Sequence, residues 1–87
     1  MATPFRLELV TPEGSAYEGA ATAAQLPGVD GLFQVLHNHA PLVAALGAGV
    51  VKVDLADGPT RRFAIDGGLV EVLANRVVVL AQRVTEA

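Results

Sequence analysis

The sequence predicts an all-β fold: a single small β-sandwich or flattened barrel of about eight to ten short antiparallel strands. Apolar residues alternate with polar or charged residues in several segments, which is the period of a strand. Turn signals that contain glycine or proline recur about every eight to twelve residues. The length of 87 residues is enough for one domain, expected to span residues 1–87.

The first third of the chain predicts three strands. Residues 5–10 alternate, which places Phe5, Leu7 and Leu9 on one face. A turn is expected at residues 11–14, followed by a short strand at residues 15–18 that Gly19 ends. Residues 20–26 can form a further strand, although alanine is a poor strand former.

The middle of the chain contains a short strand between two groups of turn residues. Pro27-Gly28 and Asp30-Gly31 are turn signals, and an apolar strand is expected at residues 32–36. A polar cluster follows, and Pro41 prevents simple continuation of that strand. Residues 41–46 can form either one or two turns of helix or a short strand.

The second half predicts a series of hairpins. Residues 49–55 alternate, with Val51, Val53 and Leu55 expected inside and Lys52 and Asp54 outside. Asp57-Gly58 indicates a hairpin turn that leads into a strand at residues 60–65. Asp66-Gly67-Gly68 is expected to turn the chain again. The last hairpin joins residues 69–73 and 76–80 around Ala74-Asn75.

Composition excludes several classes of protein. The net charge of −3 and the scattered Lys and Arg residues argue against a nucleic-acid surface. The absence of cysteine excludes disulfides and thiolate metal sites. Residues 1–6 lack the pattern of a signal peptide. The uncharged stretch at residues 32–51 contains Pro41 and several polar groups, which makes a poor membrane span. We therefore expect a soluble cytoplasmic domain.

The apolar content is high for so small a domain, with 52% hydrophobic and only 17% charged residues. Two interpretations remain open. The core is rich in alanine and valine, which bury little area each, or part of the excess lines an interface with another molecule.

No residue set predicts catalysis, a metal or a cofactor. His37 and His39 lack a third ligand, so the tripeptide His37-Asn38-His39 is interpreted as a hydrogen-bonded turn. The acidic residues fall mostly at turns or outward strand positions, without a shared apolar pocket. An alternative function is a lipoyl- or biotinyl-type carrier domain, which uses one lysine. Lys52 is the only lysine, but it lies in a predicted strand instead of at a hairpin tip.

A set of short segments along almost the whole chain resembles one family. The segments are residues 5–14, 17–19, 26–28, 31–33, 38–42, 67–72 and 77–81. In this order and spacing they resemble the N-terminal β-sandwich of the ε subunit of F-type ATP synthases. Gln34 is a departure, because the family usually has glycine there.

The resemblance implies a non-catalytic subunit of the central stalk, or rotor, that couples ion flow to ATP synthesis. Its expected partners are the γ subunit and the membrane c ring, within the complex with α and β subunits, on the cytoplasmic side of the bacterial inner membrane. The resemblance also implies that the inhibitory C-terminal helical hairpin of most ε subunits is absent here. No cofactor, nucleic acid or membrane insertion is expected.

The same resemblance suggests which residues form the interface. The loop around Gly28, Asp30, Gly31 and Leu32 is expected to face the ring, and His39, Pro41 and Leu42 are expected near γ and the ring. Leu32 has two interpretations: an apolar contact with a partner, or an inward position in the core. Under the first, Leu32→Asp is expected to weaken ring docking and leave the fold intact.

Overall fold

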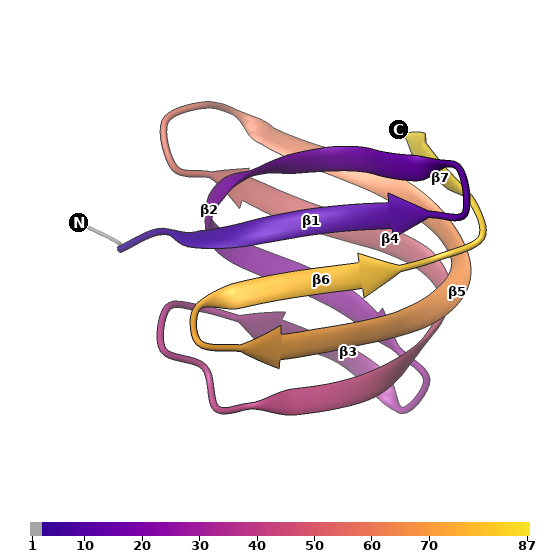
Figure 1. Cartoon of the computed structure of the whole chain (residues 1–87), viewed down its shortest axis with the longest axis horizontal. Helices are drawn as coiled ribbons and strands as arrows, with labels where there is room; N and C mark the ends of the chain where they lie inside the picture. Colours follow the sequence, from indigo (N-terminus) through magenta and orange to yellow (C-terminus); the bar gives the residue numbers. More distant parts are fainter. Residues whose placement is uncertain (1–2) are drawn as a thin grey trace.

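The computed structural model describes residues 3–87 and confirms the all-β fold class (Figure 1). The described residues form seven strands and no helix: β1 (Phe5–Thr11), β2 (Gly14–Gly28), β3 (Gly31–Val35), β4 (Leu42–Leu55), β5 (Thr60–Leu73), β6 (Arg76–Leu80) and β7 (Val84–Glu86). Residues 1 and 2, which belong to the start of the chain where no signal peptide is predicted, lie outside the described residues.

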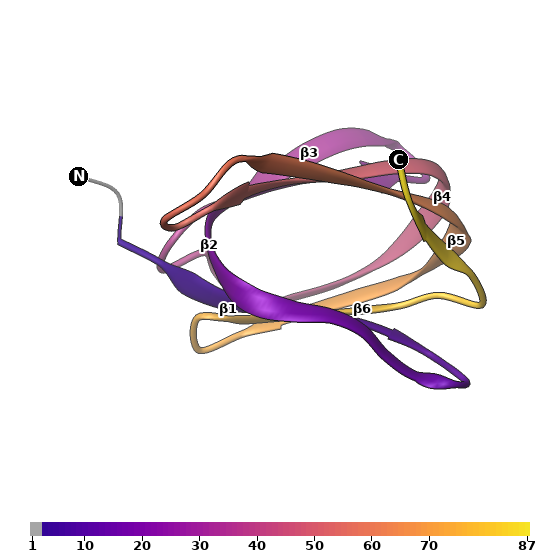
Figure 2. The same cartoon turned by 90° about the horizontal axis from the view of Figure 1, so that it is seen from above.

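The strands close into a ring. The hydrogen-bonded order is β1-β6-β5-β4-β2, and β1 also pairs with β2, which closes the circle. β3 is attached to β2 alone, and β7 pairs with β5. Seen from above, the ring is flattened into two layers, with β1 and β6 in one and β3 in the other (Figure 2). Closure leaves few unpaired strand edges, which stabilises the backbone of a small domain.

The strands are fewer and longer than the eight to ten short strands predicted, because three predicted breaks lie inside continuous strands. The chain passes Gly19 within β2, and the segments predicted at residues 41–46 and 49–55 join through residues 47 and 48 within β4. At Asp66-Gly67-Gly68, where a turn is predicted, β5 bends and continues. Gly67 and Gly68 have φ angles of 118° and 153°, which glycine adopts at little cost. Glycines inside a strand can therefore bend it, so that its two halves lie in different layers of the sandwich.

One pairing is parallel, whereas only antiparallel strands are predicted. β1 runs parallel to β6, with Leu7 opposite Val77 and Leu9 opposite Val79. Strands that are adjacent in sequence pair antiparallel through short turns. β1 and β6 come from opposite parts of the chain, so their direction is set by how the ring closes and not by a local turn.

The core fills the space between the two layers. Inward positions of the alternating segments are buried as predicted, including Phe5, Leu7 and Leu9 in β1 and Val51 and Val53 in β4. Val70, Val72, Val77 and Val79 complete the same cluster from β5 and β6. Complete burial of a valine or leucine side chain contributes roughly 1.5–3 kcal/mol, so this cluster is the main favourable term in folding.

The segment at residues 41–46, for which helix and strand remained open, is a strand. Leu42 begins β4, and residues 42–46 pair with the second half of β5, from Leu42 opposite Val72 to Leu46 opposite Gly68. Its side chains alternate between more and less buried positions, as in a strand. Pairing with β5 gives its backbone more hydrogen bonds than one or two isolated helical turns would, and such short helices are marginal in water. The final strand, β7, is not predicted from the sequence, because its three residues have no periodic pattern.

Candidate docking surface

The first group of predicted interface residues forms the tip of the β2–β3 hairpin. Gly28 ends β2 and lies opposite Gly31, which begins β3 with a φ of 130°. Asp30 is exposed in the two-residue loop, and the Leu32 side chain is 67% exposed. Of the two interpretations of Leu32, the structure therefore supports the outward position.

The second group lies in the loop that leads into β4. The His39 backbone N–H donates to the Leu36 carbonyl over 3.2 Å, which closes a tight turn. His39 is half-buried, with Nδ1 2.8 Å from the Ala40 carbonyl oxygen, and Pro41 is exposed. Leu42 is half-buried and packs against the core. Because one group precedes β3 and the other follows it, the two groups lie at opposite ends of this strand and do not form one cluster.

A larger apolar surface, which the sequence analysis did not identify, lies on the outer side of β4, β5 and β6. We call it the β5 face and define it by seven outward residues: Val43, Ala45, Leu69, Glu71, Leu73, Val78 and Leu80. Val43 lies opposite Glu71, and Leu69 lies opposite both Ala45 and Leu80. The Val43 and Leu73 side chains are 62% and 57% exposed. Grouped exposed apolar residues of this kind are typical of interaction surfaces.

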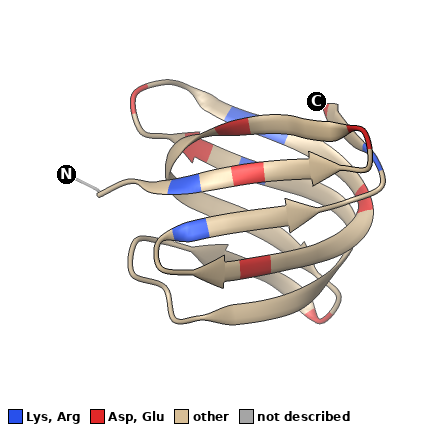
Figure 3. Ribbon diagram, in the orientation of Figure 1, with Lys and Arg blue, Asp and Glu red and all other residues tan. Residues whose placement is uncertain are grey.

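The β5 face carries little charge. Residues 31–51 contain no Asp, Glu, Lys or Arg, and Glu71 is the one charged residue among residues 67–75. Figure 3 shows the corresponding ribbons largely in tan, whereas charged positions gather on β1, β2 and the ribbons behind them. Glu71 lies in the middle of the face between Val43 and Val78, and the other six residues of the face are apolar. Depletion of charged residues over such a patch is typical of a protein–protein interface.

The hairpin tip adjoins the β5 face. The backbone N–H of Val29 donates to the carbonyl of Ala45 over 3.1 Å, and Ala45 is a member of that face. Val29 and Leu32 are both largely exposed, so they extend the apolar surface past the edge of β4. The predicted tip and the unpredicted face are therefore continuous.

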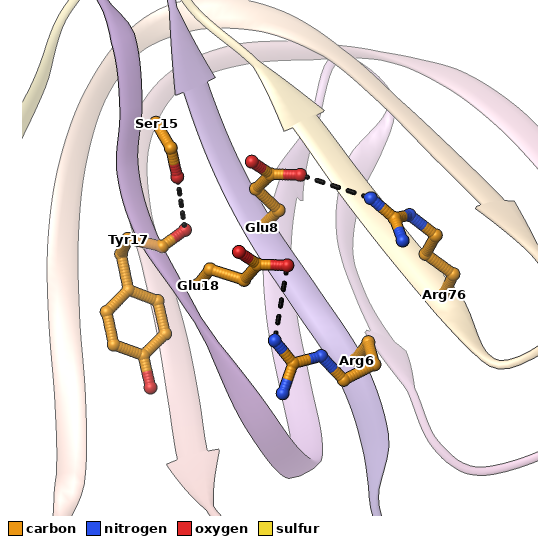
Figure 4. A network of polar contacts seen from close by, with 6 residues as sticks. All are labelled: Arg6, Glu8, Ser15, Tyr17, Glu18 and Arg76. Carbon is orange, nitrogen blue, oxygen red and sulfur yellow. Dashed lines mark hydrogen bonds and ion pairs between the residues drawn. The ribbon is translucent and has the colours of Figure 1, made fainter.

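Ion pairs border the face on the side of β1 and β2 (Figure 4). Glu8 and Glu18 lie directly opposite each other, an arrangement that is unfavourable by itself. Arg6 approaches Glu18 at 3.2 Å, and Arg76 of β6 approaches Glu8 at 3.3 Å, so each carboxylate has its own cation. Arg76 is also opposite Leu73, which places this polar region immediately beside the β5 face.

The C-terminal strand is held by a separate cluster. Arg61 donates through Nε to Oε2 of Glu86 over 2.7 Å and through a terminal nitrogen to Oε1 over 2.5 Å. Its guanidinium also lies over the rings of Tyr17 and Phe63, at 4.7 and 5.2 Å from their centroids. The hydrogen bonds from Arg61 hold the pKa of Glu86 below its ordinary value. This cluster attaches β7 to β5.

Chemistry of other kinds has little support among residues 3–87. No three His, Cys, Asp or Glu side chains within these residues, His37 and His39 included, are grouped as metal ligands. Lys52 lies within β4 opposite Gln25 and Arg62, which does not favour the carrier alternative because a carrier lysine must lie at a hairpin tip. No helix within the same residues is long and apolar enough to span a membrane.

The sequence of residues 69–73 contains a signal for the β5 face that was not used to predict an interface. Residues 69–73 carry apolar side chains at both alternate sets of positions: Val70 and Val72 are buried, while Leu69 and Leu73 are exposed. A strand with one wet face normally alternates apolar and polar residues. The excess apolar residues noted in the composition are therefore partly on this surface.

Comparison with known proteins identifies clear relatives. Residues 4–87 match the family described as ATP synthase, Delta/Epsilon chain, beta-sandwich domain. The ATP synthase epsilon chain of Chlorobium limicola is 42% identical over 81 residues, which cover 93% of this chain and 92% of that one. The ATP synthase epsilon chain of Syntrophomonas wolfei is 44% identical over 78 residues, which cover 90% of this chain and 57% of that one.

Solved structures share the fold. A chain of the Euglena gracilis mitochondrial ATP synthase, in a structure of OSCP, F1 and the c-ring, superposes with a TM-score of 0.90 at 19% identity, covering 99% of this chain and 55% of that one. A chain from the central stalk and c-ring structure of the Tetrahymena thermophila mitochondrial ATP synthase gives a TM-score of 0.79 at 14% identity, covering 97% and 67%.

Proposed function

This chain belongs to the family of ATP synthase delta/epsilon chain β-sandwich domains, and we propose that it acts as a non-catalytic central-stalk subunit of an F-type ATP synthase. In this role it binds the γ subunit and the c ring, so that rotation driven by ion flow reaches the catalytic head. Residues 1–87 act as one sandwich domain, peripheral to the membrane on its cytoplasmic side in a bacterium. The epsilon chains of Chlorobium limicola and Chlorobaculum tepidum, both bacteria, match over 92% of their own length, which supports this assignment.

The observation that carries the proposal is the exposed β5 face. A soluble domain that worked alone would gain by placing polar residues at Val43, Leu69 and Leu73, because exposed apolar groups of this density favour association. A stalk subunit gains from the same residues, since burial against a partner removes them from water. The closed ring provides the stiff body that transmission of torque requires.

We assign the two surfaces to different partners. The β5 face is broad and weakly charged, and it offers the γ subunit a largely apolar contact surface. The hairpin tip is narrow and exposed, and it reaches the c ring through Leu32. The loop with His39 and Pro41 flanks the β5 face where β4 begins.

Co-expression with a γ subunit from the same source tests the proposal. Size-exclusion chromatography then reports whether the two chains elute as a one-to-one complex. The informative variant is Val43→Asp, which introduces a charge on the β4 side of the β5 face, opposite Glu71. The matched control is Val50→Asp: Val50 is also an exposed valine of β4, but it lies opposite Ala64 in the other layer.

The wild-type chain and Val50→Asp are expected to elute with γ, and Val43→Asp is expected to elute alone with its fold intact. Failure of the folded wild-type chain to bind γ would overturn the central-stalk function. Equal binding by both variants would instead overturn the assignment of the β5 face and leave the function in place.

A further inference from the structure

A groove of about 560 Å³ lies at the end of the molecule where β1 turns into β2 and β6 leads into β7. It is lined by residues from three separate segments, among them Val10, Pro12, Asp66, Gly68, Leu80 and Gln82. This volume is in the range of sites that hold a small ligand or a protruding side chain. Leu80 belongs to the β5 face as well, so the groove opens directly beside that face.

Two glycines keep the groove free of side chains on one side. Gly67 and Gly68 form the bend of β5, and a Cβ atom added to Gly68 would overlap the carbonyl oxygen of Leu80. The backbone of β5 therefore approaches β6 closely here, and the wall consists of main chain. A cavity bounded by backbone keeps its shape better than one bounded by flexible side chains.

Asp66 supplies the one charged side chain of the lining. One carboxylate oxygen, Oδ1, accepts a hydrogen bond from the backbone N–H of Arg83 over 3.2 Å, which orients the group. The ion pairs formed within residues 3–87 are Arg6–Glu18, Arg61–Glu86 and Arg76–Glu8, and Asp66 takes part in none of them. An ionised carboxylate can accept several hydrogen bonds, so Asp66 keeps capacity for a cation.

Apolar side chains form another part of the lining. Val10 is half-buried, and Pro12 and Leu80 are exposed beside the groove. A ligand that suits both Asp66 and this apolar part of the lining has a cationic end and an aliphatic stem. Arginine fits best, because its planar guanidinium meets a carboxylate through two hydrogen bonds and is weakly hydrated, while its stem covers apolar surface.

We propose that this groove receives an arginine side chain from a neighbouring subunit, with the guanidinium paired to Asp66 and the stem against Val10, Pro12 and Leu80. The inference rests on the proposed function for the source of the arginine. Its position beside the β5 face means that a subunit docked on that face can present the side chain. The contact then adds charge recognition to an interface that is otherwise apolar.

The test uses the full chain, labelled with ¹⁵N, and N-acetyl-arginine amide as the probe. Two-dimensional NMR follows the backbone amides of Gly67, Gly68 and Gln82 during the titration. We expect saturable shifts at these amides, and far smaller shifts with the neutral isostere N-acetyl-citrulline amide. Asp66→Asn is expected to weaken the apparent affinity about three- to fivefold, the size typical of a partly exposed charge pair.

Controls separate this contact from a general effect of charge or folding. Asp57→Asn, in the exposed turn between β4 and β5, is expected to bind the probe as the wild type does. The substituted amide at position 66 can still accept from the Arg83 N–H, so the fold should be retained. If it is not, the wild-type titration at raised salt gives the same information, because an ion pair weakens with ionic strength.

Equal shifts with the citrulline amide, equal binding by Asp66→Asn, insensitivity to salt, or equal binding of N-acetyl-lysine amide would each overturn the assignment of an arginine. The probe binds a free chain and needs no γ subunit. A negative titration with successful co-elution would therefore reject the groove alone, and the reverse pair of results would reject the central-stalk function alone.

Discussion

Asn38 and Asn75 form hydrogen bonds with each other, although they are 37 residues apart in the sequence. The backbone N–H of Asn38 donates to Oδ1 of Asn75 over 2.7 Å, and Nδ2 of Asn75 donates to Oδ1 of Asn38 over 3.1 Å. Both residues have positive φ angles, 64° and 61°, and the Asn75 carbonyl also accepts from the N–H of Arg6. The pair fixes the loop that contains His39 and Pro41 to the β5–β6 turn.

This pair predicts a measurable coupling. Glycine tolerates the positive φ, so neither substitution adds backbone strain. Asn75→Gly removes both hydrogen bonds, whereas Asn38→Gly removes only the one that Oδ1 of Asn38 accepts, because the other is donated by the Asn38 backbone N–H. Each substitution is expected to lower the free energy of unfolding by about 1 kcal/mol. Urea denaturation measures the free energy of unfolding of each variant. The double variant should cost little more than Asn75→Gly alone, because Asn75→Gly already removes both hydrogen bonds; additive costs would show that the two side chains act independently.

Ala74 lies in the same turn, and its backbone conformation is expected to make the protein less stable than a glycine at this position would. Its φ of 51° lies in the left-handed region, where an alanine side chain costs roughly 1 kcal/mol. Ala74→Gly should therefore raise the free energy of unfolding, by up to about 1 kcal/mol. Ala16→Gly in β2 is the control and should lower it, since glycine weakens a strand. Thermal unfolding of both variants tests the opposite signs.

Alanine substitutions at Gly68 and Gly31 distinguish the effect of steric overlap from that of backbone strain. Both have positive φ, but a Cβ on Gly31 would meet no atom within 4 Å, whereas one on Gly68 would overlap β6. Gly31→Ala is expected to cost about 1 kcal/mol from strain alone. Gly68→Ala should cost several times more, because β5 and β6 must move apart. Similar midpoints in denaturant for the two variants would contradict this account.

Glu86 predicts a pH-dependent contribution to stability. Hydrogen bonds from Arg61 hold the pKa of Glu86 below its ordinary value of 4.5. The charged form is favoured in the folded state, so the stabilisation is complete above pH 4.5 and is lost as the pH falls through the lowered pKa.

The comparison of wild type with Glu86→Gln measures this contribution. The difference in melting temperature should be largest near neutral pH and should shrink below pH 4.5. Glu13→Gln, in the exposed turn between β1 and β2, is the control and should show no such trend. A difference that stayed constant across this pH range would show that the Arg61–Glu86 pair does not stabilise β7.

Substitution of Leu32 tests whether the hairpin tip is the site that contacts the c ring. Leu32→Asp places a charge on a side chain that is 67% exposed, so stability should change by less than about 0.5 kcal/mol. Association with the c ring should weaken, because the charge must be desolvated in the contact. Val50→Asp, in the other layer, is the control. Pull-down of the assembled rotor from membranes measures both, and unchanged recovery of Leu32→Asp would remove Leu32 from the interface.

The sequence alone determined which positions are buried and where several turns lie. Alternation over residues 5–10 and 49–55 predicted the inward side chains of β1 and β4, and Ala74-Asn75 marked the last hairpin. These are local properties, because a period of two and the conformational preferences of turn residues act over a few neighbouring positions. The ordered motifs also indicated the family, which the comparisons then showed.

The tertiary structure decided the features that depend on distant partners. Whether Gly67-Gly68 ends a strand or bends it depends on β4 and β6 beside it, and the direction of β1 against β6 depends on closure of the ring. The short β7 exists because Arg61 and the backbone of β5 hold it. Likewise, Leu69 and Leu73 look like core residues in the sequence. They lie on the outer surface because the one interior of this sandwich is already filled by Val70 and Val72, and a strand has two faces.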